Sequence, residues 1–247
     1  MKNVILKTTL SSTIILASAF AQTSFAQTWE GQGEAGIIRT TGNTESENLN
    51  LGLGLSYIQG KWTNKFVAAA YQQSSDNVDS ADSLSADYTL ERELTPRSKL
   101  FGSLGYLDDD FDGFTEKLTA SVGYGYKIID STATTWETSA GIGYRDTSTI
   151  ETDDDGVITE TDISGATFVA LSEFKTSLTA NTTFTDTFKS EIGSDNSFFE
   201  NEAAIDVAMN DRFSLKVGFL VRHNTDPGEG SDDTDTITSL SLVYKLK

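Results

Sequence analysis

The chain has few side chains that could do covalent chemistry, and the most distinctive is a lone histidine. His223 is the only histidine among 247 residues, and cysteine is absent. Thiol catalysis and thiolate metal sites are therefore excluded. No Gly-x-Ser-x-Gly or His-Glu-x-x-His motif accompanies His223, and no cofactor motif is present. A hydrolase built on His223 with serine or aspartate is one interpretation, and a structural histidine is the other.

A second segment places its acids much as a calcium-binding loop does. Residues 151–162 read Glu-Thr-Asp-Asp-Asp-Gly-Val-Ile-Thr-Glu-Thr-Asp. The corresponding residues are Glu151, Asp153, Asp155, Gly156 and Asp162. However, the last acid is Asp where a calcium loop has a bidentate Glu, and the flanking segments alternate like strands rather than helices. The pattern favours divalent cations gathering loosely at an acidic loop over a dedicated metal site.

The elements that position these residues alternate between apolar and polar side chains. Residues 48–57 show this most clearly, with leucine or tyrosine at nearly every odd position and asparagine, glycine or serine at nearly every even one. Side chains alternate with period two along a strand, so one face is apolar and the other polar. Such a segment is typical of a transmembrane β-barrel strand whose outer face meets lipid.

The same alternation recurs in about twelve segments along the chain. They are residues 29–41, 48–57, 62–73, 83–91, 100–106, 117–128, 136–144, 161–173, 177–190, 198–209, 212–224 and 240–246. An even number of strands suits a single-chain outer-membrane barrel. The predicted fold class is therefore all-β, an antiparallel up-and-down transmembrane β-barrel formed by residues 27–247. A soluble β-sandwich is the alternative, because a half-solvated antiparallel sheet alternates in the same way.

The start of the chain has the features of a secretory signal peptide. Two lysines precede an apolar run at residues 8–21, and the small residues Ser24 and Ala26 form a cleavage site, with Ala19-Phe20-Ala21 as a second candidate site. We expect residues 1–26 to be removed; an uncleaved anchor is the alternative, although the run is shorter than the ~20 residues of a membrane helix. Removal takes away two lysines and no acids, so the formal net charge changes from −19 to −21. So acidic a surface argues against nucleic acid as a partner.

The connections and the tryptophans predict an orientation in the outer membrane. Short connections alternate with longer, acidic ones, and the short ones are residues 60–61, 95–97, 130–132 and 210–211. Because outer-membrane barrels have short periplasmic turns, the acidic loops should face outward. Trp29, Trp62 and Trp136 then start strands on the periplasmic side, as an aromatic girdle requires. The expected partners are outer-membrane lipid and lipopolysaccharide, the barrel assembly machinery, and divalent cations at the outer loops.

Eight short motifs run in order along the predicted barrel. They are Trp-Glu-Gly at 29–31, Thr-Gly-Asn-Thr at 41–44, Gly-Lys-Trp at 60–62, Leu-Thr-Pro-Arg-Ser-Lys-Leu-Phe at 94–101, Ser-Val-Gly-Tyr-Gly-Tyr at 121–126, Ala-Gly-Ile-Gly-Tyr-Arg at 140–145, Ser-Asp-Asn at 194–196 and Val-Arg-His-Asn-Thr-Asp at 221–226. In these motifs the chain resembles the YdiY-like family of bacterial outer-membrane proteins, described as salt-induced or as a domain of unknown function. The resemblance implies an outer-membrane barrel with a link to external salt, and no assigned activity, cofactor or site residue. The family tends to end on an aromatic residue, where this chain has Leu246.

The inward face of the predicted barrel carries charges of both signs. By parity its acids are Glu30, Glu34, Asp87, Glu91, Glu137, Glu200, Glu202 and Asp206, and its bases are Lys117, Lys127, Arg145, Lys216 and Arg222. Opposite charges either pair and close the lumen or line a narrow aqueous path. Twelve strands do not decide this, because they lie between the filled barrel of about eight strands and the open porin of about sixteen. Inward glycines such as Gly123 and Gly125 are expected to relieve crowding.

The sequence therefore predicts a non-enzymatic outer-membrane protein. It is either a structural barrel or a narrow pore with a weak preference for cations, because the inward acids outnumber the inward bases. His223 shares its parity with the apolar face and should point toward lipid at the outer rim. An outer-membrane lipid hydrolase that uses His223 is the alternative function.

Overall fold

The computed structural model describes residues 27–41, 46–75, 78–109, 114–152, 158–194, 196–226 and 232–246. Within these ranges the chain forms twelve β-strands, and no helix is long and apolar enough to cross a membrane. The strands are β1 (Gln27–Thr41), β2 (Ser46–Gln59), β3 (Trp62–Ser75), β4 (Val78–Thr95), β5 (Ser98–Asp109), β6 (Phe114–Asp130), β7 (Thr134–Thr152), β8 (Ile158–Ser177), β9 (Thr182–Ile192), β10 (Ser197–Ala208), β11 (Phe213–Asn224) and β12 (Thr234–Leu246).

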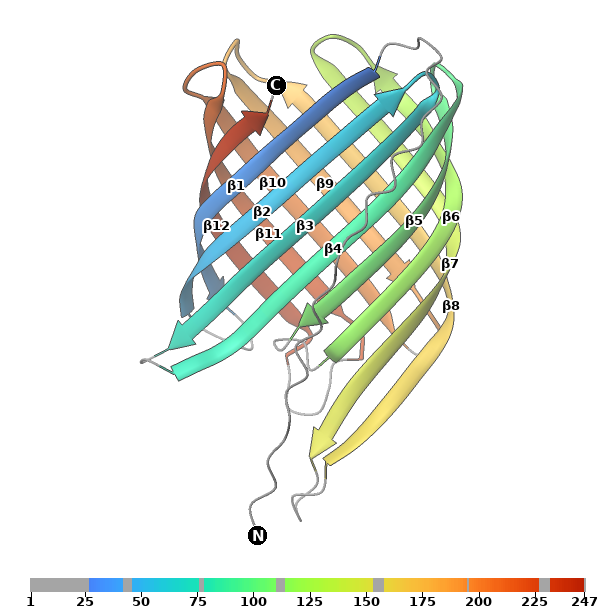
Figure 1. Ribbon diagram of the computed structural model, residues 1–247, viewed down its shortest axis with the longest axis vertical. Helices are drawn as coiled ribbons and strands as arrows, with labels where there is room; N and C mark the ends of the chain where they lie inside the picture. Colours follow the sequence, from blue (N-terminus) through green and yellow to red (C-terminus); the bar gives the residue numbers. More distant parts are fainter. Residues whose placement is uncertain are drawn as a thin grey trace.

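The twelve strands close into a single barrel. Each strand pairs antiparallel with the next in the chain, and β1 pairs antiparallel with β12 from Gly31 opposite Leu246 to Thr41 opposite Thr236. Figure 1 shows the strands strongly tilted around one lumen. This closure confirms the predicted up-and-down barrel and excludes the β-sandwich.

The barrel is packed inside out compared with a water-soluble domain. Among the described residues the only buried hydrophobic side chains are Ala204 and Val243, whereas buried serines and threonines are numerous. Large apolar side chains lie on the outward face, where Val122 is 59 % and Ile142 is 69 % exposed. A surface of this kind is stable only against an apolar medium, which matches the lipid-facing band of an outer-membrane barrel.

Aromatic side chains gather on the outward face at the end of the barrel that has the chain termini and the short turns. Trp29 packs against Tyr57 with ring centroids 4.7 Å apart, and the guanidinium of Arg92 lies 5.3 Å from the ring of Trp62. Trp136 donates a hydrogen bond from Nε1 to Ser172 Oγ at 3.0 Å. Rings with a polar tip suit the membrane–water boundary, and their position agrees with the predicted girdle.

Several strands continue further at the outer end than the alternating pattern predicts. Asp79 lies in β4 ahead of the predicted segment 83–91, and Glu151 lies in β7 beyond the predicted segment 136–144, so both acids belong to paired strands. The β7–β8 hairpin extends furthest beyond the rim (Figure 1). The segment around it is rich in threonine, which favours the β conformation without needing an apolar face. The predicted signal peptide and residues 153–157 of the calcium-like segment lie outside the described residues.

Candidate functional site

The strand register identifies the side chains that face the lumen. Ser56, Lys65, Thr89, Ser103 and Ser121 lie opposite one another along five consecutive strands, and all share the parity of the polar face. All thirteen charged residues predicted to face inward have this parity. The prediction missed further inward charges, among them Lys65, Glu93, Lys99, Glu173, Lys175, Lys189, Glu191, Asp235 and Lys245.

A ladder of ion pairs covers the lumen wall near the periplasmic end. Glu91 Oε1 on β4 lies 2.8 Å from Lys65 Nζ on β3 and 2.6 Å from Lys99 Nζ on β5. Lys99 also pairs with Glu137 on β7, and to do so its side chain crosses β6 at Gly125. A Cβ at Gly125 would lie only 2.9 Å from Lys99 Cε. This inward glycine therefore relieves crowding as predicted, and the room it leaves is used by an ion pair.

The wall formed by β10, β11, β12 and β1 is also paired along itself. Lys216 Nζ lies 2.8 Å from Glu202 Oε1 and 3.5 Å from Glu34 Oε2. Asp206 accepts a hydrogen bond from Ser214 Oγ at 2.7 Å and lies 3.6 Å from Lys245 Nζ. In both parts of the wall the partners come from adjacent strands or from strands separated by one, so these pairs do not bridge the lumen.

One outer corner of the lumen is filled by a compact charged cluster. Lys117 Nζ and Arg145 Nη1 lie 3.9 and 3.8 Å from the same carboxylate oxygen of Glu191, and both cations lie over the ring of Phe198. Arg145 is 7 % and Glu191 4 % exposed. Arg145 Nη2 also donates a hydrogen bond to the carbonyl oxygen of Asn196 at 3.1 Å, which ties β7 to the β9–β10 turn. Arg145 and Glu191 are therefore buried in this corner, and Lys117 and Glu191 also line the adjoining cavity.

A cavity of about 480 Å³ remains inside the barrel between these paired regions. Its lining follows β5 from Lys99 near the periplasmic turn to Leu107, and it reaches Asp232 and Asp233 at the outer end. Eight strand positions correspond to ~26 Å of strand. At a tilt of about 40° this is ~20 Å of barrel height, most of the ~25 Å apolar band of such barrels.

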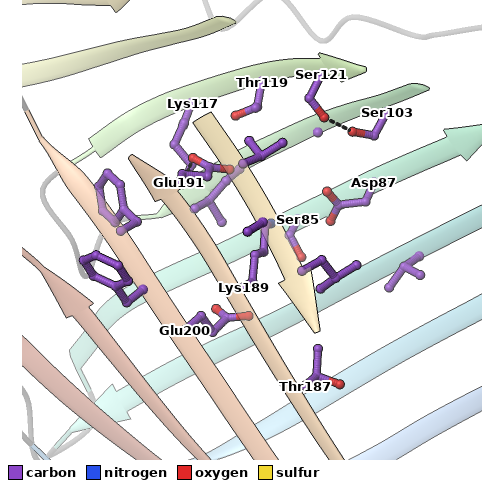
Figure 2. A pocket seen from close by; sticks show the side chains of 18 of the residues that line it. Ser85, Asp87, Ser103, Lys117, Thr119, Ser121, Thr187, Lys189, Glu191 and Glu200 are labelled. Atoms are coloured by element: carbon purple, nitrogen blue, oxygen red, sulfur yellow. Dashed lines mark hydrogen bonds and ion pairs between the residues drawn. The ribbon is translucent and has the colours of Figure 1, made fainter. Parts of the chain in front are cut away.

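The lining of this cavity contains more carboxylates than bases. Figure 2 shows charged and hydroxyl side chains from two facing walls pointing into the space. The acids are Asp87, Glu91, Glu173, Glu191, Glu200, Asp232, Asp233 and Asp235, and the bases are Lys65, Lys99, Lys117, Lys189 and Arg222. Apolar side chains also line it, among them Val67, Phe101 and Leu171. The lumen thus offers a narrow, net acidic space with apolar patches.

His223 lies on the outward parity of β11 at the outer end, as predicted. Its ring stacks on Phe199 with centroids 6.2 Å apart, and Nδ1 lies 2.9 Å from Thr234 Oγ1. Because the Thr234 hydroxyl donates its proton to Asp233 Oδ1, His223 Nδ1 is the donor to that hydroxyl. The threonine is therefore not poised as a nucleophile for His223 to activate, and the contacts join the ends of β10, β11 and β12.

Acidic side chains are candidate metal ligands in the part of the chain that the structure describes. Within these parts of the chain no group of three or more His, Asp or Glu side chains is arranged to hold a metal ion. The outer segment at residues 151–162 remains a prediction, because its central residues are outside the described ranges.

Comparisons with known proteins agree with the barrel. A family model described as "Protein of unknown function, DUF481" matches residues 33–246. The uncharacterized protein YdiY of Escherichia coli (strain K12) is 28% identical over 219 residues, which are 88% of this chain and 83% of that protein. The NanC porin superposes with a TM-score of 0.55 at 10% identity, covering 87% of this chain and all of the porin. The KdgM porin (TM-score 0.50, 6% identity) and the translocator domain of the autotransporter NalP from Neisseria meningitidis (TM-score 0.50, 12% identity) each match 87% of this chain, and 99% and 88% of their own. At such identities these structures show the fold alone.

Proposed function

Since the chain belongs to the DUF481 family and folds as a closed barrel of the outer-membrane kind, we propose that it is a non-enzymatic, narrow pore of the bacterial outer membrane. The pore passes small ions and prefers cations weakly. The family description assigns no function, and it is the lumen of this chain that supports the proposal.

One observation carries the proposal: a single cavity extends over most of the barrel height. Its lining includes Lys99, which lies one residue into β5 after the periplasmic turn, and Asp233, which directly precedes β12 at the outer end. The ion pairs that would close the lumen if they crossed it run along the wall instead, as Glu91 does with Lys65 and Lys99. This supports an open path over a structural barrel with a sealed interior.

The cation preference rests on the distribution of the lining charges. Eight carboxylates face five bases, and acids occur at both ends of the cavity, with Glu173 toward the periplasm and Asp232 and Asp233 at the outer mouth. Negative charge at a narrow mouth raises the local concentration of cations. The preference is weak because most lining bases are held close to these acids, as Arg222 Nε is at 3.0 Å from Glu200 Oε2.

His223 and Phe199 belong to the outer part of the cavity lining, but the contacts of His223 do not favour a hydrolase. The ring is held between Phe199 and Thr234 on the outward face, and these contacts support a structural role. Purified protein and its His223→Ala variant, assayed on phospholipid and lipid A, test this directly. Hydrolysis by the parent that is lost in the variant would replace the pore proposal with the enzyme.

A link to external salt is implied by the family resemblance alone, and the acidic outer end supports it as part of the proposal. Charges at the outer mouth are screened beyond ~8 Å at physiological ionic strength, so the cation preference should fall as external salt rises. Such a pore would respond to salt without a conformational change.

Planar-bilayer recording under a salt gradient tests the proposal. We expect small single-channel currents and a reversal potential of cation-selective sign. A membrane that stays silent although inserted protein is verified by antibody or by heat-dependent gel mobility would show a closed structural barrel. A reversal potential of anion-selective sign would contradict the charge argument.

A further inference from the structure

Within the described part of the chain, two opposite charges in the middle of the cavity have no direct partner. Asp87 projects from β4 and Lys189 from β9, and both line the cavity. Among the residues that the structure describes, neither makes an ion pair within 4.0 Å or a hydrogen bond. This sets them apart from the other mid-lumen charges, because Glu200 is paired with Arg222, and Glu191 lies within 4 Å of Lys117 and Arg145.

The two groups face each other from opposite walls of the barrel. Figure 2 shows Asp87 on the wall formed by the strands around β4 and Lys189 on the wall formed by β9 and β10. Lys189 attracts Asp87 although the pair does not come into contact, and Lys189 is itself attracted to Glu191 more strongly than to Asp87. Asp87 leans over Gly105, whose missing side chain gives the carboxylate room: a Cβ there would lie 2.8 Å from Asp87 Oδ1. Lys189 is exposed to the lumen.

Apolar side chains lie directly beside both charges. Val67 is opposite Asp87 in the strand register and is 50 % exposed although it faces inward. Leu171 is opposite Lys189 on the other wall, and both apolar residues line the cavity. Small inorganic ions gain nothing from such a lining, and the lumen of an outer-membrane barrel is usually polar. The combination indicates an organic solute with an apolar part.

We propose that the middle of the lumen binds small apolar zwitterions of the α-amino acid or betaine type, with the cationic group at Asp87, the carboxylate at Lys189, and the apolar part against Val67 and Leu171. The inference rests on the proposed function and names a solute class for the same lumen. A zwitterion satisfies both unpaired charges at once and adds no net charge. A singly charged solute satisfies one and leaves the other as it was.

A solute bound in the lumen should block the ion current through the barrel. The probe is L-valine added to both sides of a planar bilayer that contains the full-length mature barrel at constant potassium chloride. Two matched probes keep the same branched body and carry one charge each: isobutylamine, which lacks the carboxylate, and 3-methylbutanoate, which lacks the amine. We expect L-valine to reduce the open-channel current at concentrations about tenfold lower than either probe, as the loss of one exposed charge-assisted contact predicts.

Variants locate the block at the two charges. Asp87→Asn and Lys189→Gln should each raise the half-blocking concentration of L-valine about tenfold. The double exchange Asp87→Lys with Lys189→Asp should recover part of the block, because it keeps both charges in reversed order. Lys216→Gln is the matched control: it removes a lumen lysine that pairs with Glu34 and Glu202 and does not line the cavity, so its block should match the parent. Heat-dependent gel mobility checks that each variant folds.

The outcomes separate this inference from the pore itself. Current that L-valine blocks no better than isobutylamine and 3-methylbutanoate overturns the zwitterion site and leaves the pore intact. Block that is unchanged in both single variants overturns the assignment to Asp87 and Lys189. A silent membrane with verified protein overturns the pore, and the zwitterion site with it.

Discussion

Lys99 should stabilise the barrel more than any exposed lumen lysine, because it pairs with two carboxylates that are largely shielded from solvent. Its side chain is 14 % exposed, and those of Glu91 and Glu137 are 12 % and 16 % exposed. Replacing it in Lys99→Met keeps the length of the side chain and removes the charge. Breaking a buried pair costs about 3–5 kcal/mol. Glu91 retains Lys65 at 2.8 Å and the lumen contains water, so we expect a loss of about 2 kcal/mol.

The assay is urea-induced unfolding of the barrel in lipid vesicles, followed by the fluorescence of its three tryptophans. Lys127→Met is the control on the adjacent strand, because Lys127 Nζ lies 3.9 Å from Asp130 Oδ2 and both side chains are about 40 % exposed. Its expected loss is below about 0.5 kcal/mol. Adding Glu137→Gln to Lys99→Met should recover stability by removing the carboxylate left unpaired. Equal losses in the two lysine variants, or no recovery in the double variant, would refute the ladder as a source of stability.

Three further predictions concern Gly125, Trp29 and the two carboxylates at the outer mouth. Gly125→Ala should cost about 1–2 kcal/mol because its Cβ would displace Lys99, whereas Gly165→Ala, with nothing within 4 Å of its Cβ, should stay within about 0.5 kcal/mol in the same unfolding assay. Trp29→Ala should cost about 1–2 kcal/mol through loss of the Tyr57 contact and of interfacial burial, and an unchanged unfolding midpoint in lipid would count against the girdle. Asp232→Asn combined with Asp233→Asn should reduce the cation preference in 0.1 M salt. The double variant should have little effect in 1 M salt, because the Debye length there is about 3 Å. The reversal potential measured at the two salt levels decides this.

The strands and their inward faces could be predicted because their signal is local. Alternation with period two is visible within single segments such as residues 48–57, and a lipid-facing surface enforces it strand after strand. Trp29 and His223 were therefore assigned to the correct face without knowledge of their neighbours. The outer ends of the strands were less predictable, because beyond the lipid a hairpin such as β7–β8 continues without an apolar face.

The contacts in the lumen depend on features that one sequence does not display. Lys65 and Lys189 were missed although their parity was readable, because apolar and polar residues alternate less regularly in β3 and β9 than in residues 48–57. Lys99 reaches Glu137 across an intervening strand, and this follows from the stagger of three strands and the absence of a side chain at Gly125. The opposition of Asp87 and Lys189 depends on the number of strands and the shape of the closed barrel, so it had no signal in the sequence.

Cysteine accessibility tests most directly that the barrel encloses a continuous aqueous path. The chain has no cysteine, so single substitutions at Ser85, which lines the cavity, and at its outward neighbour Leu84 report on the two faces without background. We expect Ser85→Cys to react with a charged, membrane-impermeant thiol reagent added from either side of a proteoliposome, and Leu84→Cys to react only with a lipid-soluble maleimide. Protection of Ser85→Cys from the charged reagent, or reaction of Leu84→Cys with it, would contradict the path.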